Sequence, residues 1–240
     1  MIAWLPLRLF NSLGHVFKKR SRNARAFSFT ALMDPLSEPR FPSRVPANSK
    51  LTRRLRFLLE ADKLRRVERQ TFLSDGSRHE NSAEHSWHLA LALLLFSDAA
   101  RDSGVDLERA IQLALVHDLV EIHAGDTFVY AEQGNRVERE RHAAHLLFGE
   151  LPDEQGEEFQ ALWEEYEGKQ TPEARFVAAF DRLCPMLLNF ATDGRAWRAH
   201  GVSIEQVRAR VLPDLDALPE LRAWTNTMLE EALELGFLGA

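Results

Sequence analysis

Hydrophobic residues recur along most of the chain at the spacing of three and four residues that places them on one face of a helix. Polar residues that suit helix starts precede several of these stripes. Asn81 with Glu84 has the pattern of a capping box, and Thr171 with Pro172 has that of an N-cap followed by proline at the first helical position. The pattern predicts one helix that starts at about residue 51, further helices over 81–100, 106–122, 136–150, 153–167 and 171–192, and a last helical region from 203 that two prolines interrupt.

Residue usage favours helices over strands. The chain has 36 leucines and only 4 isoleucines, and unbranched leucine suits helices, whereas β-branched isoleucine suits strands. Its 12 glycines are scattered, and the sequence contains neither the GxGxxG dinucleotide fingerprint nor the GxxxxGKS/T phosphate loop. We therefore predict an all-α fold that does not bind nucleotides through a glycine-rich turn.

Charge is divided unevenly along the chain. Residues 1–33 carry six basic residues and no acidic one, so this part has a charge of +6 and the remainder −12. Four prolines prevent residues 34–49 from being helical throughout. We predict that residues 1–48 are a basic extension with a proline-rich linker, disordered or loosely attached, and that the folded domain covers 49–240. The first 32 residues resemble a targeting segment without its apolar core and cleavage site, and Met33 is an alternative initiator.

Hydrophobicity and cysteine content indicate where the protein acts. The longest uninterrupted apolar run, Leu89–Phe96, has 8 residues, against the roughly 18 that a membrane-spanning helix needs. The one cysteine, Cys184, can form neither an internal disulfide nor a CxxC metal clamp, which favours a reducing compartment. The acidic folded part argues against binding to nucleic acid polymers. We expect a cytoplasmic protein with neither a membrane nor a nucleic acid partner.

Three of the predicted helices each carry an ionisable residue on their apolar stripe. Taken singly, each residue has the ordinary interpretation of a hydrogen-bonded core histidine or an arginine-paired aspartate. An unpaired carboxylate in a core costs several kcal/mol or shifts its pKa, so a shared positive partner explains all three most simply. The residues and their stripes are His85 with Leu89, Leu93 and Phe96, Asp118 with Ile111, Leu115 and Ile122, and Asp181 with Val177, Cys184 and Leu188.

The adjacent His117 completes a set of two imidazoles and two carboxylates. A set of this kind without thiolate suits Mn, Fe, Co, Ni or Zn. We predict that His85, His117, Asp118 and Asp181 hold a divalent metal ion, whose identity the residue types do not fix. An ion held in this way keeps positions for water and for a phosphate oxygen, which lowers the pKa of the water and neutralises phosphate charge.

The order of these residues is informative, because His85 precedes the adjacent pair His117-Asp118 and Asp181 follows in a later helix. With the stretches ENSAEHSWHLALALLL (80–95) and HDLVEIHAGDTF (117–128), this order resembles the HD-domain superfamily of metal-dependent phosphohydrolases. It is most similar to the 5'-deoxynucleotidase branch, which dephosphorylates nucleoside monophosphates. The resemblance covers roughly residues 50–200 and implies an all-α HD-domain helical bundle, a homodimer, and one metal ion at the four residues.

Further acidic residues follow the HD pair. Glu121 lies three residues after Asp118 and four after His117, which places it on the same face of a helix. We predict that it is the general acid or base, a role that the resemblance supports, while the alternative is a carboxylate that orients a metal-bound histidine. Asp126 lies in the loop that follows, where the resemblance implies contacts with a sugar hydroxyl or the leaving group. Thr127 beside it is a further candidate for substrate binding.

Phosphate also requires a cation that keeps its charge, and arginine can bind a phosphomonoester through two nitrogen atoms. The family has an arginine some fifteen residues before its first histidine. Arg69 is the nearest match and Arg78 the competitor, and a surface charge is the ordinary interpretation of either. In the deoxynucleotidase branch an aromatic residue beside that arginine packs on the sugar, whereas the neighbour here is Gln70. We predict that Arg69 and Gln70 bind substrate and that selectivity for deoxyribose is relaxed.

The sequence thus predicts a metal-dependent phosphohydrolase that removes phosphate from nucleoside 5'-monophosphates, with deoxynucleotides as the expected substrates. One alternative is another HD reaction, such as cleavage of a cyclic or pyrophosphorylated nucleotide, against which the short chain and the match over 80–95 argue. The other alternative is a binding module that keeps the metal as a structural element. Such a module would need neither Glu121 nor Arg69, so their presence favours catalysis.

Overall fold

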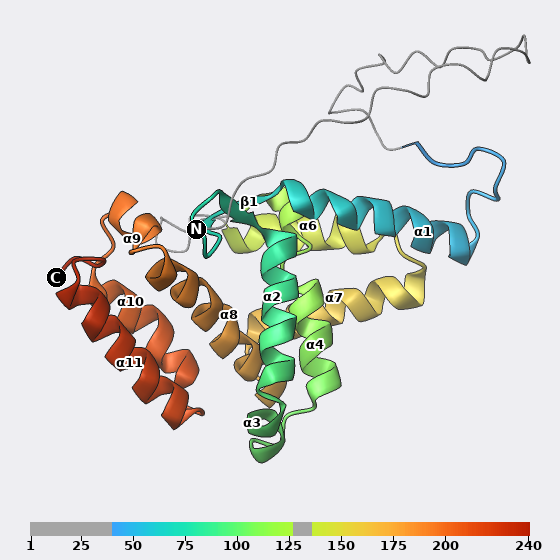
Figure 1. The fold of residues 1–240 in the computed structure, drawn as a ribbon. Coiled ribbons are helices and arrows are strands. Elements are labelled where there is room, and N and C mark those ends of the chain that lie inside the picture. The colour runs from blue at the N-terminus through green and yellow to red at the C-terminus, as the bar shows by residue number, and fades with distance from the viewer. Residues whose placement is uncertain (1–39, 127–135) are drawn as a thin grey trace, which may run out of the picture. The chain divides into compact units, whose positions relative to one another are not determined.

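The computed structural model describes residues 40–126 and 136–240, whose regular elements are helices apart from one short hairpin (Figure 1). This confirms the predicted all-α fold. The hairpin consists of strands β1 (Glu68–Phe72) and β2 (His79–Asn81), which pair antiparallel and were not predicted. The helices are α1 (Lys50–Ala61), η1 (Asp62–Arg66), α2 (Ser82–Leu95), α3 (Ser97–Asp102), α4 (Leu107–Val116), α5 (Glu121–Ala124), α6 (Arg136–Phe148), α7 (Asp153–Gly168), α8 (Pro172–Ala191), α9 (Arg195–Ala199), α10 (Ile204–Val211), η2 (Leu212–Leu215) and α11 (Pro219–Glu234).

Side-chain caps fix where helices α2, α4 and α8 begin. Asn81 accepts a hydrogen bond from the Glu84 backbone, and the Glu84 side chain accepts one from the Asn81 backbone, which completes the predicted capping box of α2. Asp106 caps α4, and Thr171 caps α8 by accepting from the Ala174 backbone. A cap of this kind stabilises a helix by about 1 kcal/mol. The caps therefore help to set the register of the helices on which the ionisable residues lie.

The predicted helix over 106–122 is interrupted. Its first part ends at Val116, a turn follows, and the short α5 ends at Ala124. The next residue, Gly125, has a φ of +75°, which a side chain would disfavour. The alignment of Asp118 with Leu115 on a buried stripe was wrong, because Leu115 is 50% exposed while Leu113 is fully buried. In a similar way, the predicted helix over 81–100 is divided into α2 and α3.

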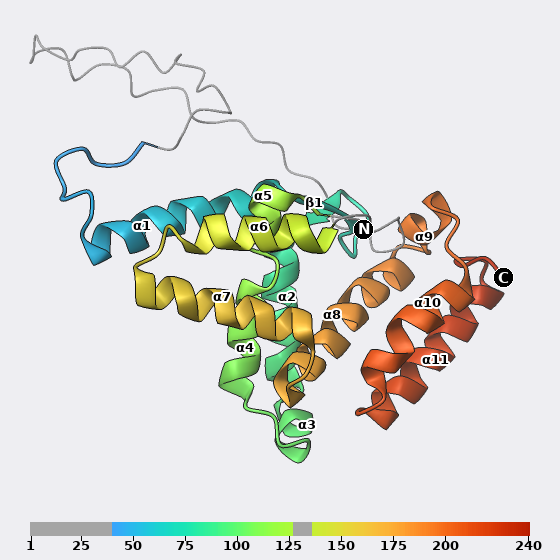
Figure 2. The same ribbon diagram turned by 180° about the vertical axis from the view of Figure 1, so that it is seen from behind.

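Helices α2, α4 and α8 pack against one another and form the centre of the core (Figures 1 and 2). Their contacting faces include Leu89, Leu93, Leu113 and Val177, none of which is exposed. Helix α7 packs on α4 and α8, and α10 and α11 lie side by side next to α8. Within the described ranges, no helix combines the length and apolar character needed to cross a bilayer.

The first helix begins at Lys50, directly after its N-cap Ser49. Residues 1–39 of the predicted extension lie outside the described residues, and Phe41–Ala240 forms a compact unit by itself. The predicted boundary between residues 48 and 49 stays a prediction.

Candidate active site

Four side chains from α2, from the turn after α4 and from α8 meet in the core. His85 Nε2 lies 2.8 Å from Asp181 Oδ1. His117 Nε2 lies 3.1 Å from Asp118 Oδ1 and 3.9 Å from Asp181 Oδ1. Suitable ligand atoms of His85, His117 and Asp118 all lie within 4.8 Å of one another. The structure thus brings together the four residues predicted as metal ligands.

The hydrogen bonds of His117 fit a metal ligand. Its Nδ1 lies 2.9 Å from the backbone oxygen of Ala114, and because a carbonyl only accepts, Nδ1 donates and carries the proton. Nε2 is buried and has no hydrogen-bond partner in the described part of the chain. A neutral imidazole would therefore direct its Nε2 lone pair toward the carboxylates of Asp118 and Asp181. A cation between these groups would remove the repulsion, so the donor set fits a divalent metal ion.

His85, the second histidine of the set, is neutral at neutral pH. Burial and the nearby charge of Arg69 lower the pKa of His85 to about 4, although Asp181 acts in the opposite direction. Neutral imidazole is the form that binds metal ions. His85 is therefore in the charge state that a metal ligand needs at neutral pH.

Asp181 is held by two residues that sequence reasoning missed. Its Oδ2 accepts hydrogen bonds from the Tyr166 hydroxyl at 2.6 Å and from Arg182 Nη1 at 3.0 Å, while Oδ1 faces the histidines. Burial alone would raise the pKa of Asp181, but Arg182 and the hydrogen bond from His85 hold it well below its ordinary value. The carboxylate therefore stays ionised, and one of its oxygen atoms is directed toward the proposed metal position.

The two candidate phosphate-binding arginines lie in different surroundings. Arg69 is largely buried in β1, and its Nη1 donates to Asp118 Oδ2 at 3.1 Å. Burial would lower its pKa, but Asp118 and Glu121 raise it, so the guanidinium keeps its charge. Arg78 lies on the surface and pairs with Glu84. The structure therefore places Arg69 in the site and Arg78 outside it.

Glu80 of β2 is a buried acid that sequence reasoning also missed. It is 2% exposed, and its Oε2 lies 3.6 Å from Arg69 Nε. Burial raises the pKa of Glu80 to about 7, against the opposing effect of Arg69. The sequence contained no signal for this residue because its burial results from the hairpin that was not predicted.

Glu80→Gln is expected to reduce the pH dependence of stability. Since folding raises the pKa of Glu80 from 4.5 to about 7, ionisation of this residue destabilises the folded protein as the pH rises through that interval, by up to ~3 kcal/mol. The variant should therefore gain stability relative to wild type at pH 8 but not below pH 4.5. Urea unfolding of chelator-treated protein at several pH values measures the difference. Parallel pH profiles for the two proteins would contradict the assignment.

Glu121 lies at the start of α5 and is 6% exposed. Its Oε2 accepts a hydrogen bond from Ser82 Oγ at 2.6 Å, and its carboxyl group is also hydrogen-bonded to Asp126. Burial, followed by the charges of Asp118 and Asp126, raises the pKa of Glu121 well above its ordinary value. A carboxyl group with a raised pKa can donate as well as accept a proton near neutral pH.

The alternative role for Glu121 was to orient a histidine. Among the described residues no hydrogen bond joins it to His85 or His117.

Asp126 also has a raised pKa, because of its burial, and lines the cavity beside Arg69. Thr127 lies outside the described residues.

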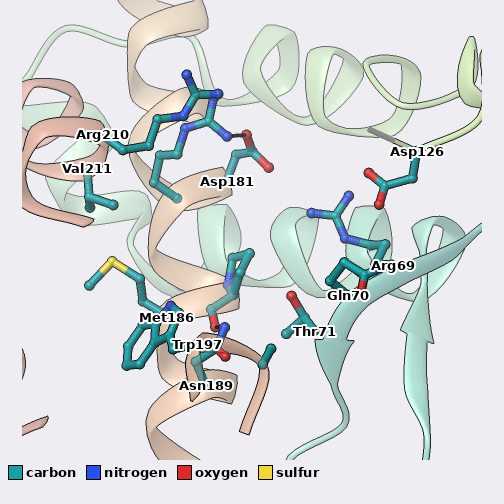
Figure 3. Close-up of a pocket in the computed structure, with 13 residues that line it drawn as sticks. Arg69, Gln70, Thr71, Asp126, Asp181, Met186, Asn189, Trp197, Arg210 and Val211 are labelled. Atoms are coloured by element: carbon teal, nitrogen blue, oxygen red, sulfur yellow. Dashed lines mark hydrogen bonds and ion pairs between the residues drawn. The ribbon is translucent and has the colours of Figure 1, made fainter. Parts of the chain in front are cut away.

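Two cavities adjoin these side chains. One has a volume of about 230 Å³ and is lined by His117, Asp118 and Glu121. The other extends past β1 to α8 and α9, where Figure 3 shows Arg69 and Asp126 facing each other and Trp197 and Met186 on another wall. Gln70 lines this second cavity, and its Oε1 lies 3.0 Å from His200 Nε2. The residues common to both cavities are Arg69, Asp126, Asp181, Arg182 and Arg210.

Three comparisons place this chain among known proteins. The model of a family described as "HD domain" matches residues 61–222. The 5'-deoxynucleotidase HDDC2 of Mus musculus is 33% identical over 139 residues, or 56% of this chain and 66% of the relative. The chain thus matches just under two thirds of the length of that relative. The 5'-deoxynucleotidase hdd1 of Schizosaccharomyces pombe is 30% identical over 182 residues, or 73% of this chain and 88% of the relative.

Among solved structures, one from Magnetospirillum magnetotacticum carries the description "Predicted metal-dependent phosphohydrolase". It is 45% identical to this chain with a TM-score of 0.77, and the match covers 80% of this chain and 97% of that one. A conserved hypothetical protein from Pyrococcus furiosus is 26% identical with a TM-score of 0.52, and the match covers 75% and 99% of the two chains.

Proposed function

This chain belongs to the HD domain family, and we propose that it is a metal-dependent phosphohydrolase that removes phosphate from nucleoside 5'-monophosphates, deoxynucleotides among them. The observation that carries the proposal is the convergence of His85, His117, Asp118 and Asp181 beside Arg69. Relatives named 5'-deoxynucleotidases support the substrate class.

The proposed metal ligands are His85, His117, Asp118 and Asp181. Two imidazoles and two carboxylates suit Mn, Co, Fe, Ni or Zn. A divalent ion in such a site stabilises negative charge on a phosphate and increases the acidity of water. Tyr166 and Arg182 would keep Asp181 in place whether or not the ion is bound, because they bind the oxygen that faces away from the histidines.

Arg69 and Glu121 have complementary roles in the proposed reaction. Arg69 keeps its positive charge in a largely buried position, where a phosphate oxygen is attracted more strongly than in water. Glu121, with its raised pKa, is suited to hold a proton for the leaving oxygen or to take one from the attacking water. Asp126 lines both cavities, where it can accept a hydrogen bond from a sugar hydroxyl.

The second cavity suits the nucleoside part of the substrate. It continues from Arg69 and Asp126 toward Met186, Asn189 and Trp197, so it combines apolar surface with a few polar groups. Pockets for small organic ligands have this composition. A nucleotide with its phosphate at Arg69 would thus have space for its sugar and base along β1, α8 and α9.

We also propose that the protein is a cytoplasmic homodimer. Helix α2 exposes several large apolar side chains, among them Trp87 at 65% and Leu95 at 71%. Large apolar side chains exposed on one helix are typical of a protein contact, and the second copy of this chain is the proposed partner. Sedimentation of the purified protein tests the dimer.

A phosphate-release assay with the full chain tests the proposed function. Chelator-treated protein is supplied in turn with each of the five metals and with deoxynucleoside, ribonucleoside, cyclic and pyrophosphorylated nucleotides. We expect metal-dependent phosphate release from 5'-monophosphates and none from cyclic nucleotides. Hydrolysis of only the cyclic or pyrophosphorylated compounds would replace the proposal with another HD reaction, and no hydrolysis of any compound would favour a binding module.

Gln70→Trp is expected to increase the preference for deoxyribose. Glutamine can donate and accept hydrogen bonds, so it should tolerate a 2'-hydroxyl, whereas an indole ring in its place should disfavour one. We expect wild type to prefer a deoxynucleotide by ~10²-fold or less. The measurement is the ratio of kcat/KM for deoxy- and ribonucleoside monophosphates with the same base.

Gln70→Ala is the control for this prediction, because it removes the amide without adding a ring. A wild-type preference far above a hundredfold that Gln70→Trp leaves unchanged would show that another part of the cavity recognises the sugar.

A further inference from the structure

One arginine at the junction of the two cavities has no anionic partner among the described residues. Arg210 of α10 lines both cavities and extends toward Asp181 (Figure 3). Its Nε is buried without a hydrogen-bond partner, and no carboxylate in the described part of the chain forms an ion pair with it. By contrast, Arg182, another arginine at the junction, pairs with Asp181 at 3.0 Å and lies 3.5 Å from Asp214.

The environment of Arg210 is unfavourable for a cation. Burial and repulsion by Arg182 and Arg136 lower its pKa, and Asp181 and Asp214 compensate only in part. A partly buried guanidinium next to another one destabilises a protein unless an anion binds to it. Arg208 on the same helix has the ordinary arrangement, because it is hydrogen-bonded to Asn226 and Glu230.

The position of Arg210 indicates which anion it binds. It reaches the cavities from α10, whereas Arg69 reaches them from β1, and both arginines line the two cavities that meet at Asp181. We propose that Arg210, with Arg182 beside it, is a second site for phosphoryl oxygen atoms. This inference rests on the proposed function, because it concerns the same cavities. The oxygen atoms belong to the phosphate that is released or to an additional phosphate on the nucleotide.

Direct binding of phosphate tests this proposal independently of turnover. Inorganic phosphate and a nucleoside 3',5'-bisphosphate are titrated calorimetrically into Mn²⁺-loaded protein that carries Glu121→Gln to suppress hydrolysis of the bisphosphate. The titrations compare this protein without a further change, with Arg210→Ala, with Arg210→Lys and with the control Arg208→Ala. A charge-assisted hydrogen bond corresponds to roughly 10- to 100-fold in affinity. We expect a loss of this size in Arg210→Ala, partial recovery in Arg210→Lys and no change in Arg208→Ala.

The two ligands distinguish the two sources of phosphate. Weaker binding of both by Arg210→Ala assigns Arg210 to the released phosphate, whereas weaker binding of the bisphosphate alone assigns it to an additional phosphate. Unchanged binding of both ligands would overturn the proposal. Failure of the proposed hydrolysis would leave this result intact, because the titration does not depend on turnover.

Thermal unfolding without phosphate separates anion binding from a structural role. Because Arg210 is repelled by Arg182 and Arg136, Arg210→Ala should unfold at the same or a higher temperature than wild type. A clear decrease in the unfolding temperature, together with unchanged phosphate affinity, would assign Arg210 to the structure of the protein instead.

Discussion

Asp118→Ala is expected to abolish metal binding, while the wild-type protein carries one transition metal ion per chain. Asp118 supplies a carboxylate 3.1 Å from His117 Nε2, so its removal deprives the proposed site of one of its four ligands. Loss of a residue that only orients a ligand already costs 10- to 100-fold in metal affinity, so loss of a ligand should cost at least ~100-fold. Elemental analysis after gel filtration measures the metal content, and phosphate release should fall with it.

Glu158→Ala is the matched control, because this exposed acid of α7 lies outside both cavities. It should keep the metal and the activity of wild type. Chelation of wild type should also lower its unfolding temperature, since an ion that binds only the folded state stabilises it and its removal leaves Asp118 and Asp181 without their shared cation. A metal-free wild type with full activity would contradict the proposed site.

The sequence was sufficient to predict where His85 and Asp181 lie. Both belong to long helices whose starts are fixed by recognisable caps, at Asn81 and Thr171. The apolar positions one turn away are buried as predicted, with Leu89 after His85 fully enclosed. When a helix is regular from its cap onward, the spacing of three and four residues determines which side chains enter the core.

Asp118 shows where the same reasoning fails. Its predicted stripe depended on a helix that continued to residue 122, but α4 ends at Val116 and the exposed Leu115 lies away from the core. Asp118 enters the site from a turn, next to His117. Spacing alone does not show where a helix ends, because no glycine or proline marks the end of α4.

The residues that sequence reasoning missed depend on contacts between distant segments. Tyr166 reaches Asp181 because α7 packs on α8, and Arg210 reaches the site because α10 lies next to α8. Glu80 is buried only because the hairpin folds it against Arg69. Each residue lies in a segment whose local pattern is ordinary, so its role appears only when the segments are placed together in space.

Glu121→Gln is expected to decrease kcat by ~10²- to 10⁴-fold while the metal content and the fold are retained. Glutamine keeps the size of the side chain and an oxygen atom that can accept the hydrogen bond from Ser82 Oγ, but it cannot exchange a proton. The change should therefore affect kcat much more than KM. Steady-state kinetics and elemental analysis of the same preparation measure both effects.

Ser82→Ala tests the same assignment without altering Glu121. The hydrogen bond from Ser82 lowers the pKa of Glu121 against the larger effect of burial, so its removal should raise that pKa further. The limb of the pH–rate profile that Glu121 determines should then move to higher pH, and it should be absent in Glu121→Gln. If Glu121→Gln keeps the activity of wild type and Ser82→Ala leaves the pH profile unchanged, Glu121 has no part in proton transfer and only orients other groups in the site.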